Sequence, residues 1–247
     1  MTPLLEICVD CDDMQRLRRS VTNALAGGAE RIELCSAIAL DGLTPTAQQI
    51  RAARDIFDRR AGVLAMIRPR AGDFCYRPSE VERMAEQIAM AADAGAGGVV
   101  LGALRGRVLD LEALDRLLPV VRGHQLSVTF HRAFDELADK ELAIEQLVER
   151  RVERLLTAGA PLAERSAATD AVESINRTLA AAQGRIEVVV GGGISCANIL
   201  PLLEKLVPAD TPLSLHSHSG LHSGGVADIG LITEMLRCIR RFRMNAV

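Results

Sequence analysis

Residues 4–13, LLEICVDCDD, form a run of strand-forming residues that ends in an acidic turn. A doubly wound open sheet that binds a dinucleotide would have a glycine-rich turn directly after its first strand. Here that turn is VDCDD, which contains no glycine. The stretch therefore favours a closed barrel, and the open doubly wound sheet is the alternative.

Similar runs recur along the 247 residues, with starts about 25 to 35 residues apart, the size of one strand–helix unit. Segments with apolar residues at helical spacing lie between them. We therefore predict an α/β fold, a (β/α)8 TIM barrel, as a single domain over 1–247, with the last helix at about 228–243. The eight predicted strands are LLEICV from Leu4, RIELC from Arg31, VLAMIRP from Val63, GVVLGAL from Gly98, LSVTFH from Leu126, VERLLTAG from Val152, IEVVVGGG from Ile186 and LSLHSHS from Leu213.

Three signals predict where helices begin. Thr46 with Gln49, and Ser79 with Glu82, have the spacing of a capping box. Asp139 precedes a helical pattern and is a typical N-cap residue.

The overall composition narrows the class of protein. A formal net charge of -3 gives no support to a nucleic-acid-binding role. The sequence has no signal-peptide pattern and no apolar run of about 18 residues, so no membrane role is expected. Six cysteines occur without a paired framework, which is typical of reduced thiols. We therefore expect a cytoplasmic protein.

Polar residues occupy alternate positions of the predicted strands. Because side chains alternate along a strand, one set, such as Ile7 and Val9, faces the helices, and the other faces the barrel interior. Buried charges must pair, so this interior is either a structural ion-pair network or a polar pocket at the C-terminal mouth, where barrel sites are built. The predicted inward-facing polar residues include Glu6, Cys8, Glu33, Cys35, Arg68, His131, His216 and His218.

Two groups of inward residues have the chemistry of metal ligands. Cys8 and Cys35 lie on neighbouring predicted strands, and soft thiolates suit Cu(I) or Zn. The alternative is that they are two small buried apolar residues. His216 and His218, followed by His222, could ligate a metal or simply line the mouth.

Other residues suggest anion binding and catalysis. Arg68 and Arg70 at the barrel mouth could bind a carboxylate or phosphate, although Arg68 could instead pair with Glu6 or Glu33. Gly191, Gly192 and Gly193 follow the seventh strand, a region that binds phosphate in many barrels, although a tight turn also requires glycine. Glu6, Glu33, Arg68 and His131 could together supply acid–base catalysis.

The motifs LEICVD, RIELC, MIRPR, VTFHRAFD and GGGISCANI resemble the CutC family, in the same order, between about Leu4 and Gly220. The resemblance implies a cytosolic TIM barrel, often a homo-oligomer, of a copper-binding class, with Cys8 and Cys35 as the Cu(I) thiols. It also implies a polar cluster at the barrel mouth. That cluster comprises Glu6, Glu33, Arg68, His131, Arg132 and His216.

Two functions follow as hypotheses. The first is copper homeostasis through Cu(I) binding at Cys8 and Cys35. The second is an enzyme acting on a small anionic or phosphorylated substrate, with Glu6, Glu33, Arg68 and His131 as catalytic residues. In that case the anion would be bound by Arg70, Arg132, Gly191–Gly193 and His216.

Overall fold

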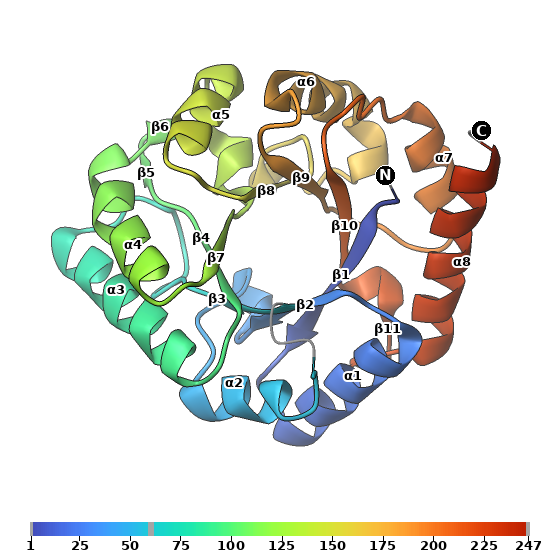
Figure 1. Ribbon diagram of the computed structural model, residues 1–247, viewed down its shortest axis with the longest axis horizontal. Coiled ribbons are helices and arrows are strands. Elements are labelled where there is room, and N and C mark those ends of the chain that lie inside the picture. Colours follow the sequence, from blue (N-terminus) through green and yellow to red (C-terminus); the bar gives the residue numbers. More distant parts are fainter. Residues whose placement is uncertain (1, 59–61, 246–247) are drawn as a thin grey trace.

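The computed structural model describes residues 2–58 and 62–245, and in these ranges the chain forms a closed barrel of eight parallel strands (Figure 1). The predicted TIM barrel is confirmed, and the open-sheet alternative is wrong. All eight predicted strands form. In their order around the barrel they are β1 (Leu4–Asp10), β10 (Leu213–Ser217), β9 (Glu187–Val190), β8 (Arg154–Thr157), β7 (Ser127–Phe130), β4 (Gly98–Leu101), β3 (Val63–Met66) and β2 (Arg31–Cys35).

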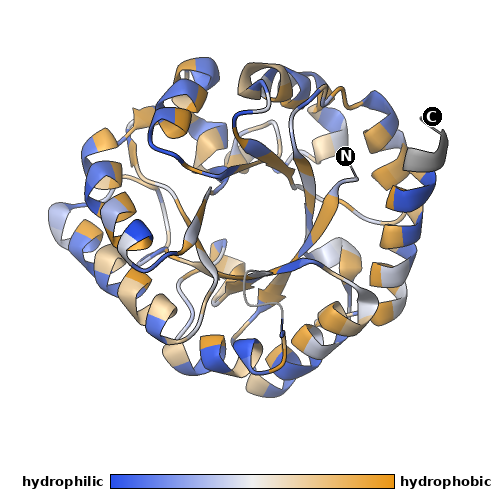
Figure 2. Cartoon of the chain, in the orientation of Figure 1, coloured by the Kyte–Doolittle hydropathy of each residue, from blue (hydrophilic) through white to orange (hydrophobic). Residues whose placement is uncertain are grey.

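The helices surround the barrel, and each carries both apolar and polar residues, as amphipathic helices do (Figures 1 and 2). The last helix extends two residues beyond its predicted end. None of the helices in the described ranges is long and apolar enough to cross a membrane. The helices are α1 (Met14–Gly27), α2 (Ala47–Arg54), α3 (Pro78–Asp93), α4 (Leu111–Gly123), α5 (Lys140–Glu149), α6 (Val172–Ala182), α7 (Ile199–Lys205) and α8 (Ile229–Asn245).

Two of the three predicted helix starts are confirmed. Thr46 and Gln49 form the capping box of α2, and Asp139 accepts a hydrogen bond from the Leu142 amide at the start of α5. The pairing of Ser79 with Glu82 is wrong, because α3 already begins at Pro78. Proline suits the first helical position, since its missing N–H would have no partner there. Glu80 instead accepts a hydrogen bond from the Arg77 amide at 2.8 Å.

The strand register brings distant inward residues into contact. In β1, Glu6 lies beside His216 of β10, and Cys8 lies beside Glu33 of β2. Cys35 is the last residue of β2 and pairs with Asp10. The predicted alternation therefore holds, and its polar members meet toward the carboxyl ends of the strands.

The predicted strand from Leu126 ends at His131, one residue beyond the observed end of β7. The strand β7 ends at Phe130, and His131 precedes a short 3-10 helix, Arg132–Glu136. Its Nδ1 atom accepts a hydrogen bond from the Ala133 amide at 3.1 Å, which turns the chain. Gly102 leaves room for the ring, since a Cβ atom there would lie 2.6 Å from His131 Cε1.

Gly98 in β4 is a second position where the barrel has no space for a methyl group. A Cβ atom would collide with Ser127 Oγ and lie 2.7 Å from Leu64 Cδ2. We expect Gly98→Ala to lower the free energy of unfolding by about 1–3 kcal/mol in urea denaturation. The control is Gly123→Ala at the end of α4, where a Cβ atom meets nothing within 4 Å. Equal stability of the two variants would contradict this account of the packing.

Candidate functional site

A cavity of about 300 Å³ opens at the carboxyl end of the barrel, where the sequence predicted a polar pocket. One side carries thiol, carboxyl and imidazole groups from β1, β2 and β10, and the side formed by β3 and β7 carries cationic and aromatic groups. The lining residues are Cys8, Glu33, Cys35, Ile38, Asp41, Gly42, Met66, Arg68, Phe74, His131, Arg132, Leu156, Leu162, His216 and His218.

Three of these residues form a cluster of metal-donor groups. The Cys8 and Cys35 sulfur atoms and a Glu33 carboxylate oxygen all lie within 4.8 Å of one another, and all three residues are buried. The arrangement follows from the register, because Cys8 is the neighbour of Glu33 and Cys35 is two residues further along β2. The two thiols were predicted as metal ligands, whereas Glu33 was predicted as a catalytic or ion-pairing member of the polar cluster. Glu33 shares the inward face of its strand with Cys35, and this shared face could have identified Glu33 as a third metal-donor group.

The two thiols differ in proton affinity. Hydrogen bonding with Cys35, helped by His216, lowers the pKa of Cys8 well below its usual range despite burial. The same hydrogen bond, together with burial, raises the pKa of Cys35. Of the two sulfur atoms, that of Cys8 therefore loses its proton more readily and is the better prepared to bind a cation.

His216 connects this cluster to the barrel interior. Its Nδ1 atom lies 2.8 Å from Glu6 Oε1, and its Nε2 atom lies 3.5 Å from Glu33 Oε2. Burial opposes protonation of His216, but the carboxyl groups and Cys8 raise its pKa well above 6.5. Burial raises the pKa of Glu33 to about 8, against the opposing charge of His216. Glu33 therefore keeps its proton to a higher pH than an ordinary carboxyl group does.

Below the cluster lies an ion-pair network, one of the two interiors that the alternation predicted, built with two arginines that were not among the predicted inward residues. Arg31 Nε lies 3.0 Å from Glu6 Oε2, and Arg31 Nη2 lies 2.6 Å from Glu187 Oε1. Arg154 donates hydrogen bonds to Thr129 Oγ1 and Ser127 Oγ. Burial opposes ionisation of Glu6, but His216 and Arg31 lower its pKa to about 2. Arg31 shares the inward face of Glu33 and Cys35, so the alternation could have identified it.

Arg68 does not make the predicted ion pair with Glu6 or Glu33, so that alternative is wrong. Its guanidinium donates to three backbone carbonyls, those of Leu40, Gly42 and Gly72, at 2.7 to 3.1 Å. The loops after β2 and β3 fold around the arginine and supply these acceptors, while Glu6 is already paired with Arg31.

Several predicted anion-binding residues are occupied elsewhere. Arg70 lies outside the cavity lining and pairs with Asp73 and Glu80, and its role in anion binding stays a prediction. Arg132 does line the cavity, but its guanidinium contacts Asp135 at 3.0 Å and the Ala160 carbonyl at 3.0 Å. The residues Gly191–Gly193 form a turn outside the lining, where Gly192 and Gly193 have positive φ angles.

The histidines near the end of β10 do not form a second metal cluster. Among the described residues, the one group with three close donor atoms is Cys8, Glu33 and Cys35. His216 and His218 both line the cavity, as the H-x-H spacing predicted. His222 instead lies against His218, with its Nδ1 atom 2.6 Å from the His218 carbonyl oxygen.

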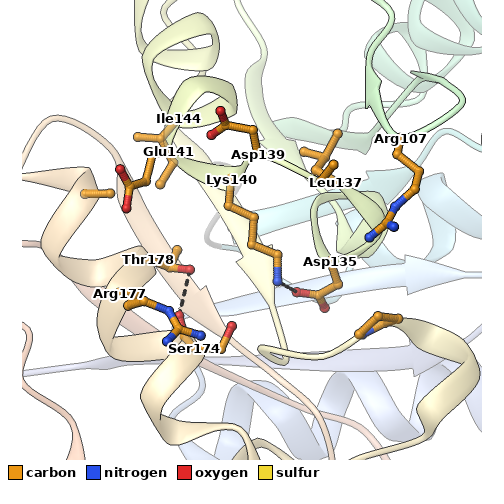
Figure 3. Close-up of a pocket in the computed structure, with 13 residues that line it drawn as sticks. Arg107, Asp135, Leu137, Asp139, Lys140, Glu141, Ile144, Ser174, Arg177 and Thr178 are labelled. Carbon is orange, nitrogen blue, oxygen red and sulfur yellow. Dashed lines mark hydrogen bonds and ion pairs between the residues drawn. The ribbon is translucent and has the colours of Figure 1, made fainter.

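A larger cavity, about 500 Å³, lies outside the barrel between α5 and α6 (Figure 3). Three of its charged residues have partners or a capping role. Lys140 lies 4.0 Å from Asp135, and Arg177 pairs with Glu173. Asp139 is the N-cap of α5. None of the predicted site residues lines this cavity, so the barrel mouth is the better candidate.

The protonation of His131 gives a testable pH dependence. Burial, reinforced by the charge of Arg68, lowers the pKa of His131 from 6.5 to about 3. Between these values the unfolded chain binds a proton that the folded protein excludes, so this contribution to stability is lost as the pH falls from 6.5 toward 3. In this range the free energy of unfolding falls by at most about 1.4 kcal/mol for each pH unit.

We expect His131→Leu to lack this contribution to the pH dependence of the free energy of unfolding, measured by urea denaturation between about pH 4 and pH 7. His124→Gln, at an exposed histidine, is the matched control. If His131→Leu has the same slope as the wild type over this range, the proposed exclusion of a proton is wrong.

Sequence comparison places the chain among known relatives. The model of the CutC family matches residues 3–216. The CutC family protein of Sinorhizobium medicae is 40% identical over 229 residues, which are 92% of this chain and 87% of the relative. The CutC family protein of Aliivibrio fischeri is 36% identical over 215 residues, which are 87% of this chain and 82% of the relative.

Solved structures agree with the barrel. A CutC protein of Streptococcus agalactiae, with a proposed role in copper homeostasis, is 30% identical, with a TM-score of 0.74 over 88% of this chain and 99% of that chain. The 3-keto-L-gulonate-6-phosphate decarboxylase of Vibrio cholerae is 14% identical, with a TM-score of 0.66 over 98% of this chain and 99% of that chain. The second likeness concerns the fold alone.

Proposed function

The chain belongs to the CutC family, and we propose that it binds Cu(I) at the mouth of its barrel as a copper-homeostasis protein. The observation that carries this proposal is the buried cluster of Cys8, Glu33 and Cys35, whose ligand atoms lie within 4.8 Å of one another. Copper is here the cargo of the protein. The proposal agrees with the role implied by the sequence motifs.

The chemistry of the donors fits Cu(I). Thiolates are soft ligands, and soft ligands select Cu(I) over hard cations such as Mg²⁺ and Ca²⁺. Glu33 Oε1 is buried without a hydrogen-bond partner, so it is an unused acceptor within the cluster. His216 is already held by Glu6 and Glu33, which supports a role in orienting the cluster over a role as a ligand.

A second candidate function is catalysis on a small anionic substrate. It is favoured by the cationic side of the cavity, where Arg68 is buried. The four residues proposed for it divide into two groups, since Glu6 and Glu33 flank His216 while Arg68 and His131 lie toward β3 and β7. A pKa of about 3 makes His131 a poor base near neutral pH, whereas Glu33, with a pKa of about 8, is the better acid–base group.

Titration of the reduced protein with Cu(I) under anaerobic conditions tests the leading proposal. We expect one equivalent of Cu(I) to be withdrawn from a competing colorimetric chelator, and Zn²⁺ at the same concentration to compete weakly. Failure to withdraw copper from even a weak chelator would contradict the proposal. Tighter binding of Zn²⁺ than of Cu(I) would reassign the metal.

The remaining predictions concern the cellular location, the oligomeric state and the partners of the protein. All six cysteines are free, which supports our proposal of a reducing, cytoplasmic location. Assembly into a homo-oligomer, and the absence of nucleic-acid and membrane partners, stay predictions. Light scattering of the purified protein would decide the first of them.

A further inference from the structure

Arg68 is a buried cation without a counter-ion. The residue is 2% exposed, and no carboxylate within the described ranges lies at ion-pair distance from it. Three of its hydrogen bonds go to neutral backbone carbonyls, and its buried Nε–H has no hydrogen-bond partner. Arg68 also lies near the Tyr76 hydroxyl, but a phenol is neutral at ordinary pH and leaves the charge uncompensated. Burial of such a charge is costly unless an anion joins it.

His131 presents a second donor to the same cavity. The residue is 3% exposed, and its Nδ1 atom accepts the Ala133 amide hydrogen, so Nδ1 must carry a lone pair. In a neutral imidazole the proton then lies on Nε2. Nε2 is buried and has no hydrogen-bond partner in the described chain. The ring therefore offers an N–H donor and has no lone pair left for a metal.

Arg68 and His131 both lie against the ring of Phe74. The Arg68 guanidinium carbon lies 5.1 Å from the Phe74 ring centroid, and the His131 and Phe74 centroids are 4.8 Å apart. Both polar residues and Phe74 line the mouth cavity. The other charged groups of that lining have different surroundings, since Arg132 pairs with Asp135 and Asp41 is exposed. Glu33 and His216 contact each other on the opposite side, in the thiol cluster.

We propose that this side of the cavity, formed by Arg68, His131 and Phe74, is a binding site for the oxyanion group of a small molecule. An oxyanion supplies the negative charge that Arg68 lacks and accepts hydrogen bonds from both donors. A cavity of about 300 Å³ is at the small end of ligand pockets, so the ligand is a compact carboxylate or phosphate ester. The site is distinct from the thiol cluster and does not rest on copper binding.

Calorimetric titration of the reduced, metal-free protein tests the proposal, with inorganic phosphate and lactate as separate probes and chloride to keep the ionic strength constant. We expect saturable binding of at least one probe with one site per chain. The stronger probe identifies the class of oxyanion. Arg68→Met and His131→Leu should each weaken binding by about tenfold, because each removes a hydrogen bond to a charged group.

Arg177→Met is the matched control, since it removes a guanidinium from the cavity outside the barrel. Its affinity should stay within about twofold of the wild type. If Arg68→Met does not fold, which the Tyr76 near-ultraviolet signal will reveal, His131→Leu decides the question. Gly102→Ala adds a second test, because its methyl group displaces the His131 ring.

Three outcomes would overturn the proposal. They are the absence of saturable binding of both probes up to about 20 mM, unchanged affinity in His131→Leu, and loss of binding in Arg177→Met. Cys8→Ser/Cys35→Ser should retain anion binding. Loss of copper affinity in that variant, with unchanged anion affinity, would show that the two sites bind their ligands independently.

Discussion

Replacing Cys8 and Cys35 together with serine is expected to weaken Cu(I) binding by more than about 100-fold. Changes to residues that merely support a metal ligand typically cost 10- to 100-fold, and this variant removes both soft ligands. Serine keeps the volume near that of cysteine but offers a hard, protonated oxygen. The measurement is competition with a Cu(I) chelator at known free copper.

Two single replacements make this test specific. Cys196→Ser removes a cysteine that hydrogen bonds to the Leu231 carbonyl, outside the cavity, and should leave the copper affinity unchanged. Glu33→Gln keeps both thiols and should weaken binding by about tenfold at most, since a hard carboxylate is the weakest Cu(I) donor of the three. Copper affinity that survives the double cysteine replacement would show that the thiol site is wrong.

Replacing Arg31 with methionine is expected to lower the free energy of unfolding by about 3–5 kcal/mol. Arg31 lies between Glu6 and Glu187, at 3.0 and 2.6 Å, and the arginine and Glu6 are almost completely buried. Without it, two carboxylates remain in the barrel with less compensation, and Arg154 donates to neutral hydroxyls of Thr129 and Ser127. Urea denaturation followed by circular dichroism at neutral pH measures the effect.

An exposed ion pair provides the control. Arg185 and Glu145 make a contact of 2.5 Å on the surface, with side chains 35% and 50% exposed. Arg185→Met should cost less than about 1 kcal/mol. If Arg31→Met lowers the free energy of unfolding no more than Arg185→Met does, the buried ion-pair network does not stabilise the barrel.

The strand pattern of the sequence was sufficient to predict the fold and the location of the site. The turn after Val9 and the recurrence of strand-like runs identified the barrel, and alternation along β1 and β2 placed Cys8 and Cys35 in its interior. Both signals are local, because they depend on which face of a strand each side chain occupies. The structure agrees with them.

The partners of the inward charges could not be predicted in the same way. Alternation shows that Glu6 and Arg68 face inward, but not which cation reaches which carboxylate. That choice depends on two features of the closed barrel. The register between β1 and β10 places Glu6 beside His216. Arg31 lies 3.0 Å from Glu6 and is its ion-pair partner. Arg68 instead donates hydrogen bonds to carbonyls of loops whose paths no strand pattern determines. The ion pairs of Arg70 with Asp73 and Glu80 depend on a loop in the same way.

The most direct test of the central claim is X-ray absorption at the copper edge of the reduced protein loaded with one equivalent of Cu(I). The proposed site predicts a first coordination shell with two sulfur ligands, which the Cys8→Ser/Cys35→Ser variant loses. A shell made only of nitrogen and oxygen, or a sulfur shell that persists in that variant, would contradict copper binding at the barrel mouth.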